Sequence, residues 1–231
     1  MSYFKFGLSR EFECSYLPDH KEQLLVYIDE QPMTQERYTF FQQEGFRRSQ
    51  DIVYRPHCQD CNACQSVRLE VKKFKPSRSQ KRIINKCRRF SVKVSYEVRD
   101  NYYPLFKNYI NSRHHDGVMY PAEPSQLDSF AVCEWLKPWF IEVYDDDKLI
   151  GVGVSDPSST TLSAVYSFFD PDYSSYSLGT FLVLKQIDLA IKTDRNFLYL
   201  GYYIEDCQKM NYKTNFKPYQ IRLAERWVKV E

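Results

Sequence analysis

Between residues 161 and 204 the spacing of hydrophobic positions changes twice. Residues 161–169 (TLSAVYSFF) are rich in β-branched and aromatic side chains, which suit a half-buried strand. Residues 178–193 carry apolar side chains close to helical spacing, and residues 196–204 (NFLYLGYYI) form a second short apolar run. The order strand, loop, helix, strand predicts a right-handed crossover between two parallel strands.

The loop that leads into this helix is the expected place for a ligand, because ligands bind beyond the carboxyl ends of parallel strands. Ser177 is placed to cap the helix through its hydroxyl group. Gly179, in the first turn, can let a phosphate or a ligand backbone approach the free amides of the helix. A glycine chosen only for close packing of the helix on the sheet is an equal alternative.

The other apolar segments complete an α+β pattern. Before residue 91 the expected elements are strands at 23–29, 46–55 and 66–71 and helices at 34–44 and 77–90. After it they are strands at 92–98, 139–144, 149–155 and 219–226 and helical segments at 102–114, 125–135 and 210–216. This second order resembles the GNAT acyltransferase fold. We therefore expect a GNAT-like domain at 91–231, with a smaller Cys-containing N-terminal α/β region, residues 1–90, packed against it.

The resemblance to GNAT proteins implies a reaction class, acyl transfer to an amine, without fixing the substrate. GNAT enzymes that use acyl-coenzyme A hold its pyrophosphate with a glycine-rich turn. Residues 176–180 (YSLGT) stand in the place of that turn. Coenzyme A is therefore not the expected donor.

Positive charge is concentrated in one segment. The chain has 231 residues and a net charge of +2, yet residues 71–113 hold 13 basic and 2 acidic side chains. No acid interrupts the run from Lys72 to Arg89, and positions 78, 81, 82, 86 and 89 fall on one face of the expected helix. A merely solvated helix normally mixes both signs, so this face favours contact with a nucleic-acid backbone. The candidate contacts are Lys75, Lys81, Arg82, Lys86 and Arg89.

The chain carries no recognisable targeting or membrane segment. Residues 1–10 are polar and charged, and no apolar run reaches the length of a membrane span. Seven cysteines, an odd number without a secretory signal, do not indicate a disulfide framework. We therefore expect a soluble protein in the cytoplasm, of unspecified oligomeric state.

Three of the cysteines form a compact motif. Cys58, Cys61 and Cys64 have the spacing C-x2-C-x2-C, which can point three thiolates at one iron–sulfur cluster or zinc ion. A fourth ligand would have to come from elsewhere in the chain. The candidates for it are Cys14, His57, His20 and Cys87. The alternative is three reduced, buried cysteines that shape a tight turn.

Two further clusters contain groups suited to chemistry. Lys209, Tyr212 and Lys213 follow the second strand of the crossover, and the two lysines are i, i+4 neighbours that can face one anion. A solvent-exposed basic turn explains them equally well. His114 and His115 point about 100° apart if they lie on a helix, so at most one can face a given site. For this pair a structural or surface role is the favoured interpretation.

Several long motifs, in order, resemble one family. They are YRPHCQDCNACQSVRLEV (54–71), FKPSRSQKR (74–82), SAVYSFFDP (163–171), SLGT (177–180), LYLGYYI (198–204) and KMNYKTNFKP (209–218). The chain is similar to the aminoacyl-tRNA–protein transferases of the N-degron pathway, and more closely to the short bacterial aspartate/glutamate leucyltransferases. This resemblance implies transfer of leucine from leucyl-tRNA to proteins that begin with Asp or Glu. In the eukaryotic relatives a C-x2-C pair serves iron–sulfur binding, whereas here Cys14 is followed by Leu17.

The implied chemistry assigns provisional roles. An aminoacyl ester is already activated, so transfer needs a positioned neutral amine, donors for the oxyanion, and no cofactor. The amides of Leu178, Gly179 and Thr180 are expected to meet the aminoacyl end. The candidates for pairing with the acceptor's carboxylate are Lys209, Lys213 and Arg78. The candidates for orienting or deprotonating the amine are Tyr166, Asp170 and Tyr212.

Other functions remain open on the residues alone. The eukaryotic branch of the same family transfers arginine, although those chains are much longer. A metal-stabilised RNA-binding module without catalysis and a GNAT-like enzyme that uses coenzyme A are alternatives from other classes. The apolar strand–helix–strand with its ligand-end glycine favours an enzyme over a simple RNA binder.

Overall fold

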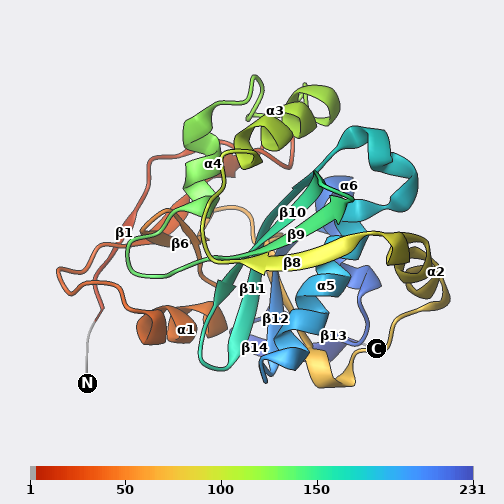
Figure 1. Ribbon diagram of the computed structural model, residues 1–231. Coiled ribbons are helices and arrows are strands. Elements are labelled where there is room, and N and C mark those ends of the chain that lie inside the picture. Colours follow the sequence, from red (N-terminus) through yellow and green to blue (C-terminus); the bar gives the residue numbers. More distant parts are fainter. Residues whose placement is uncertain (1–3, 231) are drawn as a thin grey trace.

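The computed structural model describes residues 4–230, which form three β-sheets and several helices (Figure 1). The strands are β1 (Phe6–Leu8), β2 (Phe12–Glu13), β3 (Lys21–Glu22), β4 (Leu24–Tyr27), β5 (Arg47–Ser49), β6 (Ile52–Pro56), β7 (Gln65–Glu70), β8 (Ser91–Ser95), β9 (Trp139–Asp145), β10 (Lys148–Pro157), β11 (Thr161–Phe169), β12 (Phe197–Tyr203), β13 (Tyr219–Leu223) and β14 (Arg226–Val230). The α-helices are α1 (Gln35–Gln43), α2 (Arg78–Lys86), α3 (Tyr102–Arg113), α4 (Pro124–Ala131), α5 (Leu178–Lys192) and α6 (Gln208–Asn211). The 3₁₀ helices are η1 (Val71–Lys73), η2 (Cys87–Arg89), η3 (Pro171–Tyr176) and η4 (Tyr212–Asn215).

The predicted crossover is confirmed. Strand β11 runs into α5, and α5 returns to β12, which pairs with β11 in parallel. From β8 onward the elements follow the order that the sequence predicted for a GNAT-like domain, so the α+β fold class is confirmed as well. Within residues 4–230 no helix combines the length and the apolar character that crossing a bilayer requires.

The main sheet has eight strands in the order β14-β13-β7-β12-β11-β10-β9-β8. Helices α3 and α4 pack on one face of its β9–β11 part through a core that includes Phe106, Phe130 and Phe168. Helix α5 covers the opposite face, where Phe181 and Leu182 pack with residues of α2 and η2. The loop at the carboxyl end of β11 is thus held between two helical layers.

The N-terminal residues form a smaller sheet, β1-β4-β6-β5, covered by α1. One strand from this part of the chain, β7, is hydrogen-bonded within the main sheet between β13 and β12. A buried ion pair, Arg48 of β5 with Asp156 of β10, joins the small sheet to the large one. The two regions therefore share a continuous interior, and the division near residue 90 stays a prediction.

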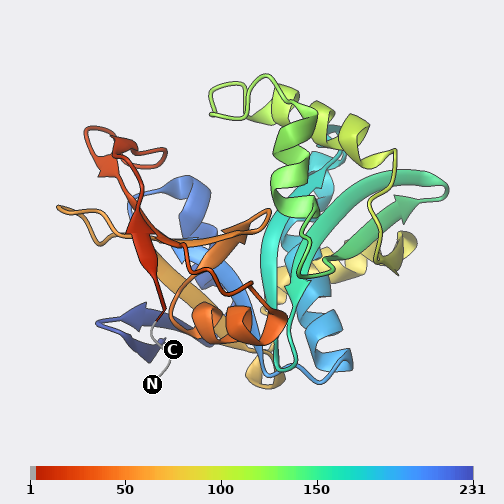
Figure 2. The ribbon, with the colours of Figure 1, turned by 90° about the vertical axis from the view of Figure 1, so that its left-hand side faces the viewer.

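The parallel pairing of β11 with β12 is short. Only three pairs connect them: Thr161 with Phe197, Leu162 with Leu198, and Ser163 with Tyr199. Beyond these pairs the strands diverge, and Figure 2 shows the two halves of the main sheet opening away from each other. An opening at the carboxyl ends of parallel strands is where a ligand is expected.

Four expected segments differ in detail. Residues 46–55 and 219–226 were each predicted as one strand, but each contains a reversal: Gln50 has φ +48°, and Ala224 and Glu225 have φ +43° and +65°. The helix expected at 125–135 ends at Ala131, because Val132 is extended. The helix expected at 77–90 tightens into η2 at Cys87.

The cap of α5 also differs from the prediction. Ser177 is the N-cap residue, but its backbone is left-handed (φ +54°, ψ +47°) and its side chain makes no capping hydrogen bond. The loop before it is the 3₁₀ helix η3, whose first turn is capped instead by Asp170 through the amide of Asp172. The expected position of the cap is therefore confirmed and its expected hydrogen bond is wrong.

Candidate active site

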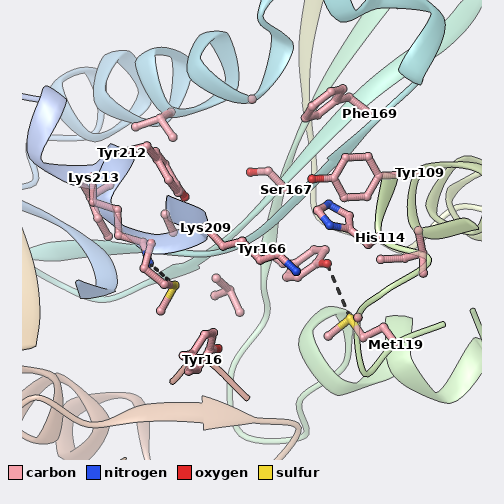
Figure 3. Close-up of a pocket in the computed structure, with 18 of the residues that line it drawn as sticks. Tyr16, Tyr109, His114, Met119, Tyr166, Ser167, Phe169, Lys209, Tyr212 and Lys213 are labelled. Carbon is pink, nitrogen blue, oxygen red and sulfur yellow. Dashed lines mark hydrogen bonds between the residues drawn. The ribbon is translucent and has the colours of Figure 1, made fainter. Parts of the chain in front are cut away.

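A pocket of about 580 Å³ lies in the opening between β11 and β12 (Figure 3). Its wall comes from β11, the first turns of α5, the α6–η4 segment, the C-terminal end of α3 with the following loop, and the N-terminal loop that carries Tyr16. The lining residues with polar or charged side chains are Ser15, Tyr16, Arg47, Tyr109, His114, Asp116, Tyr166, Ser167, Thr180, Gln186, Lys209, Tyr212 and Lys213. The pocket is therefore a meeting point of distant segments.

The α5 end of the pocket matches the sequence prediction in part. Gly179 and Thr180 line the cavity. A Cβ at position 179 would lie 3.2 Å from Cε1 of Phe169, so this glycine also permits close packing of the helix on β11. Leu178 is fully buried in the core and does not line the pocket, which leaves only its backbone available to a ligand.

Of the three residues considered for orienting the amine, Tyr166 and Tyr212 line the pocket and Asp170 does not. Tyr166 stacks on Phe130, with ring centroids 4.4 Å apart, and its hydroxyl lies 3.6 Å from Sδ of Met119. Burial raises the pKa of Tyr166, so it remains protonated at neutral pH and can donate but not act as a base. Asp170 is buried and forms an ion pair with Lys148, at 2.7 Å.

The three cations proposed for carboxylate recognition have different surroundings. Lys209 Nζ lies 3.2 Å from Oδ2 of Asp116 at the rim of the pocket. Lys213 is buried, and its side-chain nitrogen donates to the carbonyl oxygen of Tyr202. Burial, and after it the charge of Arg47, lowers the pKa of Lys213 to about 7. Arg78 lies at the start of α2 and is not part of the pocket lining.

Arg47 was missed by the sequence interpretation. It comes from β5 in the small sheet, and its Nη2 atom donates to the carbonyl oxygens of Ala164 (2.9 Å) and Val165 (3.0 Å) in β11. The contact depends on Gly201, which has φ +83° and where a Cβ would lie 2.0 Å from Nη1 of Arg47. No local pattern in the sequence brings residues 47, 164 and 201 together, so only the tertiary structure could reveal this contact.

His114 also lies in the pocket wall, whereas the sequence favoured a structural or surface role. It is the C-cap residue of α3, and its ring packs against Tyr109 with centroids 4.9 Å apart. Burial, together with the charges of Arg113 and Lys209, lowers the pKa of His114, so the imidazole is neutral at pH 7. A neutral imidazole in a pocket wall can accept a proton.

The cysteine loop does not have the geometry of a metal site. Cys58 and Cys61 face each other across an isolated β-bridge, which makes a tight turn. Among residues 4–230 no group of three or more Cys, His, Asp or Glu side chains is arranged to hold a metal ion. Burial raises the pKa of the Cys64 thiol to about 12, which favours the protonated form. The expectation of iron–sulfur or zinc binding at Cys14, Cys58, Cys61 and Cys64 is therefore not supported by the described residues.

The predicted basic face lies on α2 and its flanks. Lys75, Lys81 and Arg82 are exposed and have no carboxylate partner among the described residues. Lys86 donates to the carbonyl oxygen of Ser175, and Arg89 pairs with Asp145 at 2.8 Å. Three cations of the basic face therefore have no carboxylate partner in the described part of the protein, and the other two are bonded to other segments of it. Helix α2 also contacts the pocket wall, because the Gln80 side chain donates to the carbonyl oxygen of Asn215 in η4.

The order of the elements from β8 onward and the divergence of β11 and β12 are those of a GNAT-like fold. Two solved structures share this fold: a DUF2156 C-terminal domain from Agrobacterium fabrum (TM-score 0.53, 12% identity, 83% of this chain and 61% of that chain) and L-PGS from Bacillus licheniformis (TM-score 0.50, 8% identity, 84% and 63%). This chain spans about three fifths of each, and at such low identity the likeness concerns the fold alone.

Closer relatives identify the family. The family profile described as "Arginine-tRNA-protein transferase, N terminus" matches residues 12–82, and the one described as "Arginine-tRNA-protein transferase, C terminus" matches residues 101–223. The chain is 47% identical to an aspartate/glutamate leucyltransferase of Pseudoalteromonas atlantica over 96% of both chains. It is 44% identical to that of Aeromonas hydrophila over 98% of this chain and 95% of the relative. The chain belongs to the arginine-tRNA-protein transferase family of aminoacyltransferases, which confirms the resemblance carried by the sequence motifs.

Proposed function

We propose that this chain transfers leucine from leucyl-tRNA to the N-terminal amine of proteins that begin with Asp or Glu, and so marks them for degradation. The observation that carries this proposal is the similarity along nearly the whole chain to relatives named aspartate/glutamate leucyltransferase. Charged tRNA is the co-substrate, and its supply places the reaction in the cytoplasm.

The pocket offers what aminolysis of an ester requires. The aminoacyl end enters beside the first turn of α5, where Gly179 and Thr180 leave backbone amides close to the cavity. Tyr166 donates to the reacting groups through its hydroxyl. His114 accepts the proton that the acceptor's α-ammonium must lose before its nitrogen can attack the ester carbonyl. As the amide bond forms, the ester C–O bond breaks and the tRNA leaves through its ribose oxygen, which takes up the second proton of the amine. Holding amine and ester together in one enclosed site supplies most of the acceleration, because the ester is already activated.

The basic face of α2 is the proposed contact for the tRNA backbone. Its free cations lie on the outside of the protein, and its inner side touches η4, which carries Lys213 of the pocket wall. A helical stem on α2 would therefore send its single-stranded 3′ end toward the cavity. In this arrangement the basic face of α2 binds the tRNA backbone while the pocket binds the aminoacyl group of the same molecule.

Transfer is tested with labelled leucyl-, arginyl- and phenylalanyl-tRNA and with peptides that begin with Asp, Glu, Asn or Gln. We expect label from leucyl-tRNA on the Asp and Glu peptides. The pocket lining holds several cations, and the side-chain carboxylate of the first residue of these peptides can pair with them. The uncharged peptides are expected to react about tenfold to a few hundredfold less, as measured by kcat/KM. Transfer from arginyl-tRNA in its place would assign the arginyl activity, and transfer from neither would overturn the proposal.

Binding of tRNA is expected to depend on salt through α2. Replacing Arg78, Lys81 and Arg82 by Gln should weaken binding and reduce the slope of log K against log salt by about 0.7–0.9 for each phosphate that is no longer neutralised. Filter binding at several salt concentrations measures the slope. The matched control replaces three exposed lysines outside this face, Lys107, Lys137 and Lys192, and should keep the wild-type slope. Equal slopes for the two triple variants would rule out α2 as the tRNA contact.

A further inference from the structure

Arg47 reaches into the pocket from a sheet that contributes little else to it. Its guanidinium is held in place by two hydrogen bonds from one nitrogen, Nη2, to the carbonyl oxygens of Ala164 and Val165. These carbonyls lie on β11 just past Ser163, the last residue that pairs with β12. The side chain therefore fills the start of the opening and has a fixed orientation.

The rest of this guanidinium has no partner in the described part of the protein. No acceptor for Nε or Nη1 and no carboxylate at ion-pair distance is found among residues 4–230. The neighbouring residue gives the contrast, since Arg48 is fully buried and uses Nε and Nη2 to bind both carboxylate oxygens of Asp156. A half-buried guanidinium with free donors is unfavourable unless an anion completes it.

The surrounding charges leave this part of the pocket positive. Lys213 is the next basic group, and within residues 4–230 it too has no carboxylate partner. Asp116 is the one carboxylate among the described lining residues of the pocket, and it is already paired with Lys209. The described lining therefore leaves Arg47 without a negatively charged partner, which an anionic ligand would supply.

We infer that Arg47 is the specificity-determining residue for the acceptor: its free Nη1 group donates to the side-chain carboxylate of an N-terminal Asp or Glu. This inference rests on the proposed function. A hydrogen bond from a guanidinium to a carboxylate oxygen carries charge on both sides, whereas an amide of the same shape offers a single neutral oxygen. The basic face of α2 is outside the pocket, so phosphates are met elsewhere and the interior cation remains for the peptide.

This assignment replaces the cations named from the sequence. Lys209 is engaged at the rim, Arg78 is outside the lining, and Lys213 donates its hydrogen bond to Tyr202. Arg47 has free donors inside the pocket and a fixed position, a combination that none of these three residues has.

The inference is tested by direct binding of short peptides to the full chain, with calorimetry, and by the ratio of kcat/KM for Asp and Asn peptides. We expect the Arg47→Gln variant to lose the preference for Asp over Asn by about tenfold to a few hundredfold in both measurements. Gly201→Ala should have the same effect without removing a charge, because the new Cβ takes the place of Nη1. The ratio compares two peptides on one enzyme sample, so a reduced folded fraction cancels.

Arg37→Gln is the matched control, since this arginine on α1 bonds Gln31 and Pro32 and does not line the pocket. It should keep the wild-type ratio. A wild-type preference that survives in Arg47→Gln would overturn the inference and leave the proposed function intact. A protein that binds Asp peptides through Arg47 but never transfers leucine would support the inference and overturn the proposed function. Equal wild-type binding of Asp and Asn peptides would overturn the inference whatever the transfer assay gives.

Discussion

Replacing Arg48 by Met is expected to destabilise the protein by about 3–5 kcal/mol, because the carboxylate of Asp156 would be left buried without its partner. Both side chains are completely inaccessible to solvent, and the pair is bidentate, with distances of 2.8 and 2.5 Å. Tyr38 donates a further hydrogen bond to the same carboxylate. Chemical denaturation measures the loss, and in a chain of this size it corresponds to a fall in Tm of roughly 10 °C.

A double variant separates the cost of an unpaired charge from the value of the pair. Combining Arg48→Met with Asp156→Leu should recover part of the loss, since neither charge then remains buried. Recovery is incomplete because Arg48 also donates to the carbonyl oxygens of Phe130 and Val132. The exposed pair of Lys72 and Asp194 is the control, and Lys72→Met should cost less than about 1 kcal/mol. Strict additivity of the two buried replacements would contradict this account.

Stability is expected to rise with pH between 7 and 9 because of Lys213. In the native protein the pKa of this lysine is about 7 instead of 10.5, mainly because of burial. Over this range the unfolded chain keeps the proton that the native protein has released, so raising the pH favours the native state. The contribution amounts to about 2 kcal/mol over the two pH units. Unfolding by urea at several pH values measures it.

The comparison that isolates this effect uses two variants. In Lys213→Met the pH-dependent contribution should vanish, although removal of the hydrogen bond to Tyr202 changes the absolute stability. Lys209→Met, an exposed lysine of the same segment, should keep the wild-type dependence. If the variants at 213 and 209 show the same pH dependence as the wild type, Lys213 is not a neutral amine in the native protein.

Local patterns predicted most of the secondary structure and the ends of the elements that form the pocket. The crossover from β11 through α5 to β12 follows from two apolar strands and a helix with clear spacing, so it was correctly predicted. Gly179 and Thr180 reach the pocket because they begin α5, Tyr212 and the two lysines of the α6–η4 segment because they follow β12, and Tyr166 because it lies on β11 itself. The chain reversals at Gln50 and Glu225 were not predicted, because these residues adopt positive φ although they are not glycine.

Local sequence patterns could not predict contacts between segments that lie far apart in the chain. Arg47 and Arg48 are adjacent in sequence, yet one enters the pocket and the other the core, because successive residues of β5 point to opposite faces. The sequence could not show that a strand near the N-terminus meets β11 near residue 164. The spacing of the three cysteines likewise did not reveal the local geometry, a tight turn in which Cys58 and Cys61 face each other across a β-bridge.

The short contact between β11 and β12 has a mechanical consequence. The main sheet consists of two four-stranded plates, β14-β13-β7-β12 and β11-β10-β9-β8, joined by three residue pairs at one end. Elsewhere the two halves are tied by side chains, because α5 packs against both β11 and β12 in one core. Arg47 ties β5 to β11 just beyond the last of these pairs, where the strands separate. A ligand that binds the Arg47 guanidinium would therefore load the point at which the two halves of the sheet separate.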